Sequence, residues 1–281
     1  MTHKLILCAD DFALSPAVSR GILEALHEGR LNAASALTTT PFWRGDARSL
    51  SAPGLDAAIG IHINLTLGSP LSAMPAFAPA FNFPPLGAVL RGAMLGSLPQ
   101  AEIRAEIARQ IDAFVEAYGH PPDFVDGHQH IQVLPGIRRW LLEELAKRGW
   151  AGRMWVRDST DDLSRIFARR AEIPKALALV AFGLGFKALA ESFGFESNDG
   201  FAGFSAFDAR ADYSRAFDSY LKAPGARHLV MCHPGHVDAE LIVTDPVTTT
   251  RENELTFLLS PAFREALRRA NMRLSRWDRQ D

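Results

Sequence analysis

The chain has 281 residues, with 30 lysines and arginines against 32 aspartates and glutamates, so its formal net charge is −2. This length suits one large domain, since α/β barrels of about 250 residues commonly fold as a single unit. The balanced charge excludes the basic footprint of a nucleic-acid-binding protein. A hydrophobic content of 47% excludes a largely disordered chain. Two cysteines, Cys8 and Cys232, are too few for a disulfide framework and indicate a reducing compartment.

The sequence shows neither a targeting peptide nor a membrane span. The apolar stretch at residues 5–9 is too short for a signal-peptide core, and two aspartates follow it at once. The longest later apolar run, residues 176–186, has 11 residues, whereas a spanning helix needs about 20. We therefore predict a cytoplasmic protein that forms a single catalytic domain over residues 1–281.

Short apolar runs alternate with amphipathic segments along the chain. Residues 4–9 predict a buried strand, and Ser15 followed by Pro16 marks the start of a helix over residues 16–28. Further strands are predicted at 32–38, 57–63, 124–126, 153–156, 228–232 and 272–274, and further helices at 43–51, 101–117, 136–148, 212–221 and 260–270.

Two segments interrupt this alternation, at residues 68–98 and 160–200. Both are rich in alanine and phenylalanine, and we predict them to be helical excursions, with two helices in residues 160–200. The remaining strands and helices alternate about seven times, which predicts a parallel sheet. At this length a closed or nearly closed (β/α) barrel is favoured over an open doubly wound sheet.

The predicted strands end in polar side chains, and in such barrels the carboxyl ends of the strands carry the active site. Five strands deliver an ionisable residue to this rim. The polar residues at the strand ends are Asp10, Asp11, His62, Asn64, Asp126, His128, His130, Arg157, His233 and His236.

Asp10 and Asp11 follow the first strand directly. Two adjacent carboxylates are costly together unless a cation or a shared proton relieves their repulsion. The alternative is that one of them caps the next helix, for which Ser15 is better placed. One carboxylate can therefore bind a metal while the other faces a substrate.

The histidines at the strand ends have alternative interpretations. His62 lies between apolar neighbours, so it is also compatible with a core histidine bonded to a backbone carbonyl. His128 and His130 can both bind a metal, or one can bind it while the other contacts substrate, and Asp126 can orient a metal-binding imidazole. His233 precedes a Pro-Gly turn, which exposes it at the rim or in solvent.

The sequence lacks the signatures of several common enzyme classes. No GxSxG, P-loop or GxGxxG motif is present, so serine-esterase, nucleotide-hydrolase and dinucleotide-binding functions lack their signatures. We predict Cys232 to be a buried strand residue, and we predict as surface residues His3, His27, His120 and His228.

Four segments, ADDFALSP, GIHINLT, VDGHQHIQVLP and VMCHPGH, occur in this order over nearly the whole chain. In these four segments and their order, the chain resembles the YdjC-like carbohydrate deacetylase family. The resemblance implies a distorted (β/α) barrel related to polysaccharide deacetylases. It also implies a metal-dependent hydrolase that removes the N-acetyl group from an acetylated amino sugar and releases acetate. The family's usual glycine in the first segment is Ala13 here, a departure that concerns the local backbone conformation.

The resemblance also implies roles for individual residues. Asp11, His62 and His128 would bind one divalent metal, Asp10 would be the general base, and His233 would be the general acid or a substrate contact. Two imidazoles and one carboxylate suit Zn²⁺ or another transition ion, whereas the resemblance favours Mg²⁺. The ligand set therefore leaves the identity of the ion open.

The expected partner is a small acetylated amino sugar or oligosaccharide, with a homodimer as an option that the resemblance allows. His130 and Asn64 are predicted to bind substrate. Arg157 is predicted either to bind substrate or to pair with Asp126. Six aromatic residues are candidates for stacking on a sugar ring, namely Trp43, Phe81, Phe83, Trp155, Phe201 and Phe204.

Two other functions are compatible with parts of this pattern. One is a metal-dependent phosphoesterase of the HxH type, which usually binds two or three metals and needs more carboxylates and histidines than this set. The other is a carbohydrate-binding protein without activity, against which the intact set of candidate catalytic residues argues. The number of metal ions per chain separates the deacetylase from the phosphoesterase.

Overall fold

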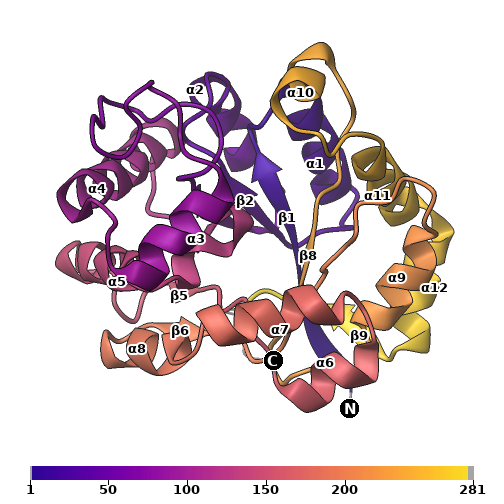
Figure 1. Ribbon diagram of the computed structural model, residues 1–281. Helices are drawn as coiled ribbons and strands as arrows, with labels where there is room; N and C mark the ends of the chain where they lie inside the picture. The colour runs from indigo at the N-terminus through magenta and orange to yellow at the C-terminus, as the bar shows by residue number, and fades with distance from the viewer. Residues whose placement is uncertain (1, 278–281) are drawn as a thin grey trace.

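The computed structural model describes residues 2–277, and in them a parallel sheet curls into a half-barrel (Figure 1). The strands are β1 His3–Phe12, β2 Ala33–Ala36, β3 Ala58–Ile63, β4 Phe124–Gly127, β5 Trp155–Val156, β6 Glu196–Ser197, β7 Phe201–Ala202, β8 His228–Cys232 and β9 Met272–Leu274. From edge to edge the order is β6, β5, β4, β3, β2, β1, β8 and β7, while β9 pairs with the start of β1. Residues 198–200 join the two edge strands β6 and β7, which are not hydrogen-bonded to each other within the described residues. The curled parallel sheet confirms the predicted distorted (β/α) barrel.

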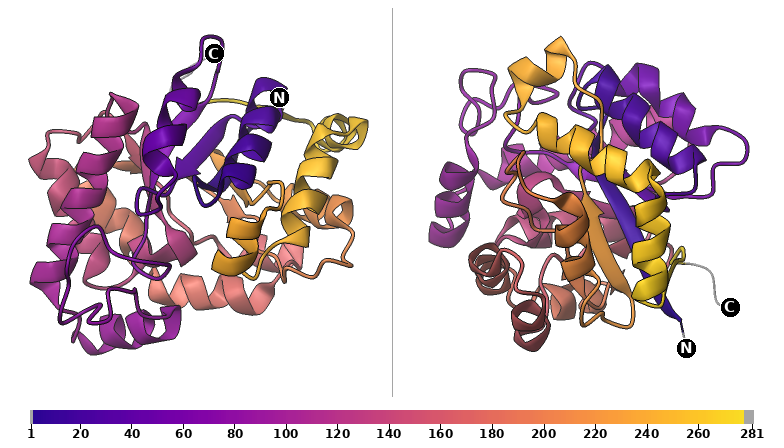
Figure 2. Two further views of the ribbon diagram at one scale, coloured as in Figure 1. Left: turned by 90° about the horizontal axis from the view of Figure 1, so that it is seen from above. Right: turned by 90° about the vertical axis from the view of Figure 1, so that its right-hand side faces the viewer.

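Helices surround the sheet in both views of Figure 2. The helices are α1 Pro16–His27, α2 Trp43–Asp46, α3 Leu86–Leu95, α4 Gln100–Tyr118, α5 Ile137–Lys147, α6 Leu163–Arg169, α7 Ile173–Phe182, α8 Phe186–Ser192, α9 Tyr213–Tyr220, α10 Ala239–Thr244, α11 Thr249–Leu259 and α12 Pro261–Arg269. Two 3₁₀ turns, η1 Ala47–Ser51 and η2 His128–Val133, complete the set that the described residues form.

The sequence patterns locate most of these elements. Ser15 caps α1 as predicted, because its side chain accepts a hydrogen bond from the Val18 backbone N–H. The predicted bounds of β8 and β9 agree with the structure residue by residue. The segment 160–200 contains three helices and β6 rather than the predicted two helices. Strands of two residues and the short helix α10 carry too few residues to show a periodicity.

The core lies between the sheet and the helices. β1 runs through the centre of the sheet and is buried from residue 5 to residue 12. α4 turns one apolar face inward, on which Ile103, Ile107, Ile111 and Phe114 are fully buried. Each such side chain contributes about 1.5–3 kcal/mol on burial. This packing fixes the strands whose carboxyl ends carry the polar residues.

The apolar run in the second excursion lies on the surface. α7 is composed mainly of apolar residues, but Ala176 is its only buried one. Within residues 2–277 no single helix has the length and apolarity to span a membrane. Taken together, α7 and α8 are long and apolar enough to span a membrane by length and composition alone, with a bend of 43° between them.

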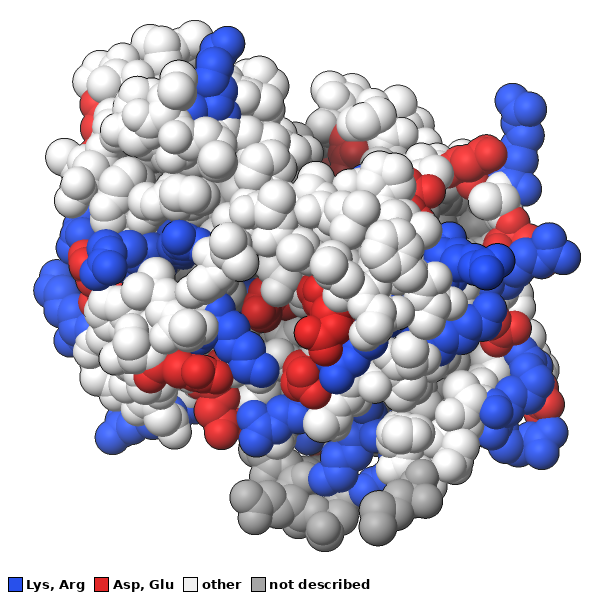
Figure 3. Space-filling model, turned by 60° about the horizontal axis from the view of Figure 1, so that its bottom comes forward, with Lys and Arg blue, Asp and Glu red and all other residues white. Residues whose placement is uncertain are grey.

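A hollow of about 650 Å³ opens at the end of the barrel where the strands begin, which Figure 3 brings forward. Charged residues of both signs surround it, including Asp123, Glu196 and Arg227. Trp155 lies here, stacked on Trp277 with ring centroids 5.0 Å apart. The proposal that Trp155 stacks on a sugar at the rim of the strand ends is therefore wrong, because the side chain points to the opposite end.

Candidate metal-binding active site

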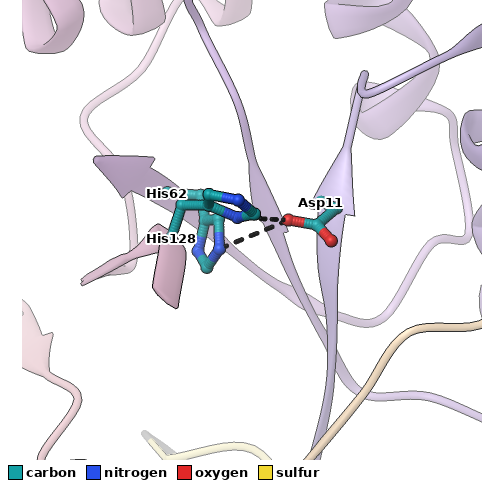
Figure 4. Close-up of side chains that lie close together, drawn as sticks. All are labelled: Asp11, His62 and His128. Atoms are coloured by element: carbon teal, nitrogen blue, oxygen red, sulfur yellow. Dashed lines mark hydrogen bonds and ion pairs between the residues drawn. The ribbon is translucent and has the colours of Figure 1, made fainter. Parts of the chain in front are cut away.

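Asp11, His62 and His128 meet at the carboxyl ends of β1, β3 and β4 (Figure 4). Asp11 Oδ1 lies 3.0 Å from His128 Nδ1 and 3.5 Å from His62 Nε2. One ligand atom from each residue lies within 4.8 Å of the other two, and all three residues are buried. One carboxylate and two imidazoles at this spacing fit a divalent cation and leave coordination positions for other ligands.

The backbone around these residues adopts conformations that residues other than glycine rarely adopt. Asp11 and Ala13 have φ values of 67° and 68°, and the register of β1 against β2 shifts between Ala9 and Phe12. Ala13 thus occupies a glycine-type conformation, the one for which the family's glycine is suited. After β4, Gln129 and His130 also have positive φ, at 54° and 63°. Such strain is typical of functional sites, where the fold aims side chains at a fixed point.

His62 is oriented by a carboxylate on the neighbouring strand. Its Nδ1 lies 2.6 Å from Asp126 Oδ1, and the Ser35 hydroxyl donates to the same oxygen. Burial lowers the pKa of His62, but the carboxylates of Asp126, Asp10 and Asp11 outweigh it and leave the pKa raised. With Nδ1 engaged, Nε2 remains directed toward Asp11, as a metal ligand requires.

Asp10 is held by the buried Arg157. Both oxygens of Asp10 accept hydrogen bonds of 2.7 Å from the guanidinium, which also contacts Asp126 at 2.6 Å and Cys8 Sγ at 2.9 Å. Burial opposes ionisation of Asp10, but Arg157 outweighs it and lowers the pKa of Asp10 to about 2. Of the two alternatives for Arg157, the structure shows the ion pair with Asp126, and the fully buried side chain lies outside the cavity lining.

Arg251, a residue that no motif indicated, holds the second oxygen of Asp11. It extends from α11, is buried, and donates from Nη2 to Asp11 Oδ2 at 2.7 Å and to Asp245 Oδ2 at 2.8 Å. Burial raises the pKa of Asp11, but Arg251 and His128 outweigh it and hold the pKa well below its ordinary value. The carboxylate therefore presents Oδ1 to the imidazoles in an ionised state.

His233 follows β8 and faces the same cavity. Its backbone N–H donates to Glu254 Oε2 at 2.6 Å, and its ring packs edge-on against Phe207 with centroids 5.3 Å apart. Burial lowers the pKa of His233, although Asp11 and Asp10 partly oppose this. Burial also raises the pKa of Glu254 from 4.5 to about 7. The turn that carries His233 is thus anchored on the buried carboxyl of Glu254, which is an unusually weak acid.

We predict that the Glu254→Gln variant has a flatter dependence of stability on pH than the wild type. Folding favours the protonated carboxyl of Glu254, so its contribution is full below pH 4.5 and is lost as the pH rises through about 7. The loss is of the order of 3 kcal/mol. Glutamine cannot titrate but can still accept the His233 N–H bond. Urea unfolding of both proteins between pH 4.5 and pH 8 measures the difference, and parallel curves would contradict the assignment.

Of the remaining residues predicted at the rim, His130 lines the catalytic cavity, whereas Asn64 and His236 do not. His130 lines the cavity, and burial lowers its pKa to about 3, so its ring is neutral at physiological pH. The Asn64 amide holds its own loop by donating to Thr39 and to the Leu67 carbonyl. His236 points away and lies 3.1 Å from Glu24. Substrate contact by His130 and Asn64 stays a prediction.

The three candidate ligands line a cavity of about 550 Å³. The other ionisable residues of its lining are Asp10, His130, Lys175, His233, Asp245 and Arg251. Apolar side chains of α3 and α7 form part of its wall, and the other apolar residues come from β8 and from loops. The apolar wall includes Leu86, Leu90, Leu134, Ala178, Leu179, Phe182, Phe204, Phe207, Met231 and Val247.

Two groups of expectations need correction. Of the six aromatic stacking candidates only Phe204 lines this cavity, whereas Trp43, Phe83 and Phe201 are buried in the protein and the half-exposed Phe81 lies outside it. His228 is a core residue rather than a surface one, with Nε2 2.9 Å from the Tyr220 carbonyl oxygen. The other three, His3, His27 and His120, are exposed as predicted.

The fold and the site define a (β/α)-barrel protein with a candidate hydrolytic metal centre at the carboxyl ends of its strands. The chain belongs to the YdjC family, because the model of this family, described as YdjC-like protein, matches residues 4–269.

Curated relatives match over nearly the whole chain. A protein of Klebsiella pneumoniae (strain 342) named chitooligosaccharide deacetylase is 32% identical over 279 residues, which cover 98% of both chains. A Serratia marcescens protein of the same name is 31% identical over 276 residues, covering 95% of both chains. A crystal structure from Enterococcus faecalis V583, described provisionally as a cellobiose-phosphate cleavage protein, superposes with a TM-score of 0.74 at 21% identity. It covers 98% of this chain and 97% of its own, and this likeness supports the fold.

Proposed function

We propose that this protein is a metal-dependent carbohydrate deacetylase, which hydrolyses the N-acetyl group of an acetylated amino sugar and releases acetate. The observation that carries the proposal is the convergence of Asp11, His62 and His128 in one cavity with Asp10 and His233. The names of the relatives support the substrate class.

The residues divide into metal ligands and proton carriers. Asp11, His62 and His128 would hold one divalent ion, with Asp126 orienting His62 and Arg251 fixing Asp11. Bound there, such an ion supplies positive charge that polarises an amide carbonyl and makes a water molecule more acidic. The ligand set fits Zn²⁺ and Mg²⁺, and we propose Mg²⁺ on the strength of the family resemblance.

Asp10 would accept the proton that the attacking water loses. Arg157 keeps Asp10 ionised and fixes the direction of both carboxylate oxygens. His233, at the end of a different strand, would donate a proton to the departing amine. Because burial lowers its pKa, the imidazole would be neutral at rest, and it would receive the proton that Asp10 took from the water before donating it to the amine. The net result is the transfer of a proton from water to the amine.

The surroundings favour one metal ion rather than several. A second group of candidate ligands in the described residues, Cys8, Asp10 and Asp126, has the Arg157 guanidinium in contact with all three. A phosphoesterase of the HxH type would use more ions than this arrangement supports. Two free, buried cysteines accord with a cytoplasmic location, which we include in the proposal.

The test is acetate release from N-acetylated glucosamine oligomers by the purified protein, with and without a chelator. We expect acetate and a free amine in equal amounts, loss of activity with the chelator, and recovery on adding back one divalent ion. Absence of acetate from every acetylated amino sugar tried, despite one bound metal per chain, would reject the proposal. Hydrolysis of p-nitrophenyl phosphate with two or more ions per chain would support the phosphoesterase instead.

A further inference from the structure

Arg251 is a buried arginine that leaves one of its nitrogens without a partner. It is 1% exposed and belongs to the lining of the catalytic cavity. Nε donates to the Val247 carbonyl oxygen at 3.0 Å, and Nη2 donates to Asp11 and to Asp245. Nη1 carries two further N–H groups and has no hydrogen-bond partner among residues 2–277. A buried donor without a partner is costly, so this nitrogen points to a ligand that carries an acceptor oxygen.

Arg169 shows how a buried arginine with a structural role is paired. It is 5% exposed and lies outside the lining of the catalytic cavity. All three nitrogens of its guanidinium donate to backbone carbonyl oxygens, from Nε at 2.9 Å, from Nη1 at 2.8 Å and from Nη2 at 2.9 Å. The unpaired Nη1 of Arg251 therefore does not follow from burial alone.

Arg251 lies next to the groups that would carry out the reaction. Asp11 presents Oδ1 to the two imidazoles of the candidate metal site, while its Oδ2 accepts the bond from Arg251 at 2.7 Å. The Gly235 N–H donates to the Arg251 carbonyl oxygen at 3.2 Å, which ties the turn after His233 to the same residue. Burial lowers the pKa of His233, and the nearby guanidinium lowers it further. An amide on which Asp10 and His233 act would therefore have Arg251 beside it.

Amide hydrolysis places negative charge on one particular oxygen. When the water oxygen bonds to the acyl carbon, an electron pair of the C=O bond moves onto the acyl oxygen. When the C–N bond then breaks, that pair re-forms the C=O bond, and the oxygen leaves as part of the acetate carboxylate. Fixed N–H donors aimed at this oxygen stabilise the transition state. A guanidinium suits this task, because its charge is permanent and its N–H groups match the geometry of a carboxylate.

We propose that Arg251 is a catalytic residue whose Nη1 donates hydrogen bonds to the acyl oxygen of the substrate. This inference rests on the proposed function and adds a group that stabilises the charge formed during the reaction. The same nitrogen would bind a carboxylate oxygen of the acetate product. Arg251 would then serve two purposes, since Nη2 fixes Asp11 and Nη1 holds the reacting group.

The experiment compares the full-length wild type with Arg251→Lys in three measurements. These are kcat and KM for acetate release from N-acetylated glucosamine oligomers at saturating divalent ion, the dissociation constant of added sodium acetate, and the affinity of the metal-free protein for the ion. Lysine keeps a positive charge for Asp11 and Asp245 but lacks the guanidinium fork. We expect kcat to fall by about 100-fold with KM changed by less than about twofold. The dissociation constant of acetate should rise about tenfold.

A residue that only orients Asp11 would give a different result. Loss of such a residue weakens metal affinity by about 10–100-fold. Saturating ion would then restore kcat, and acetate would bind as in the wild type; this result would overturn the proposal. The matched control is Arg169→Lys, the same substitution at a buried arginine outside the catalytic cavity, and it should match the wild type in all three measurements.

Asp245→Asn is a second variant, which keeps the test valid if Arg251→Lys does not fold. Removing the Asp245 charge leaves the Arg251 guanidinium less neutralised, so acetate should bind about threefold more tightly. Unchanged or weaker acetate binding in this variant would overturn the proposal. Wild-type kcat and acetate affinity in Arg251→Lys would reject the role of Arg251 alone. Absence of acetate release by the wild type would instead reject the proposed function, and the role of Arg251 with it.

Discussion

Replacing Asp10 by asparagine is expected to lower kcat for acetate release by about 10³-fold, within the usual range for losing a general base. The amide keeps the size of the side chain and can still accept a bond from Arg157, but it cannot accept the proton of the attacking water. Asp10 is not among the three side chains whose ligand atoms converge, which are Asp11, His62 and His128. The variant should therefore bind one metal ion per chain, like the wild type.

The measurement pairs single-substrate kinetics with metal analysis of the same preparation. Asp218→Asn is the matched control, since Asp218 pairs with Arg269 on the surface, and it should retain both activity and metal. Full activity of Asp10→Asn would show that another group accepts the proton. Loss of the metal together with activity would make Asp10 a ligand instead.

Replacing His128 by alanine should abolish both metal binding and turnover. His128 supplies one of three ligand atoms, and it lies 3.0 Å from Asp11 Oδ1. Removing a residue that only orients a metal ligand weakens metal affinity by about 10–100-fold. Removing a direct ligand should therefore weaken metal affinity by more than about 100-fold. Isothermal titration of the metal-free protein with the divalent ion measures this directly.

His236→Ala serves as the control for this variant. His236 is a half-exposed histidine that lies 3.1 Å from Glu24 and outside the catalytic cavity. We expect its metal affinity and activity to match the wild type. Unchanged metal affinity in His128→Ala would remove His128 from the ligand set and leave Asp11 and His62 without their third partner.

The convergence of polar side chains at one rim could be predicted, because carboxyl ends of parallel strands meet there. The family resemblance, not the strand pattern, singled out Asp11, His62 and His128 among these side chains, and the structure brings them together although 117 residues separate the first from the last. The orientation of His62 by Asp126 was foreseeable for the same reason, since both lie on paired strands.

The groups that support the ligands could not be predicted in this way. Arg251 reaches Asp11 across 240 residues from α11, a helix whose sequence has no clear apolar periodicity. Arg157 was correctly placed at a strand end, but sequence does not tell whether a side chain there points into the cavity or behind it. Phe42 and Trp43 are adjacent aromatic residues, and only packing decides that Trp43 is buried while Phe42 stays partly exposed.

A titration of metal-free protein with a divalent ion, while acetate release is followed, tests the single metal centre directly. A single centre predicts no acetate before metal is added, a rate that rises in proportion to the metal, and a plateau at one ion per chain. In His128→Ala the same titration should give no acetate at any point. Acetate release without metal, or a plateau at two or more ions per chain, would contradict the single centre formed by Asp11, His62 and His128.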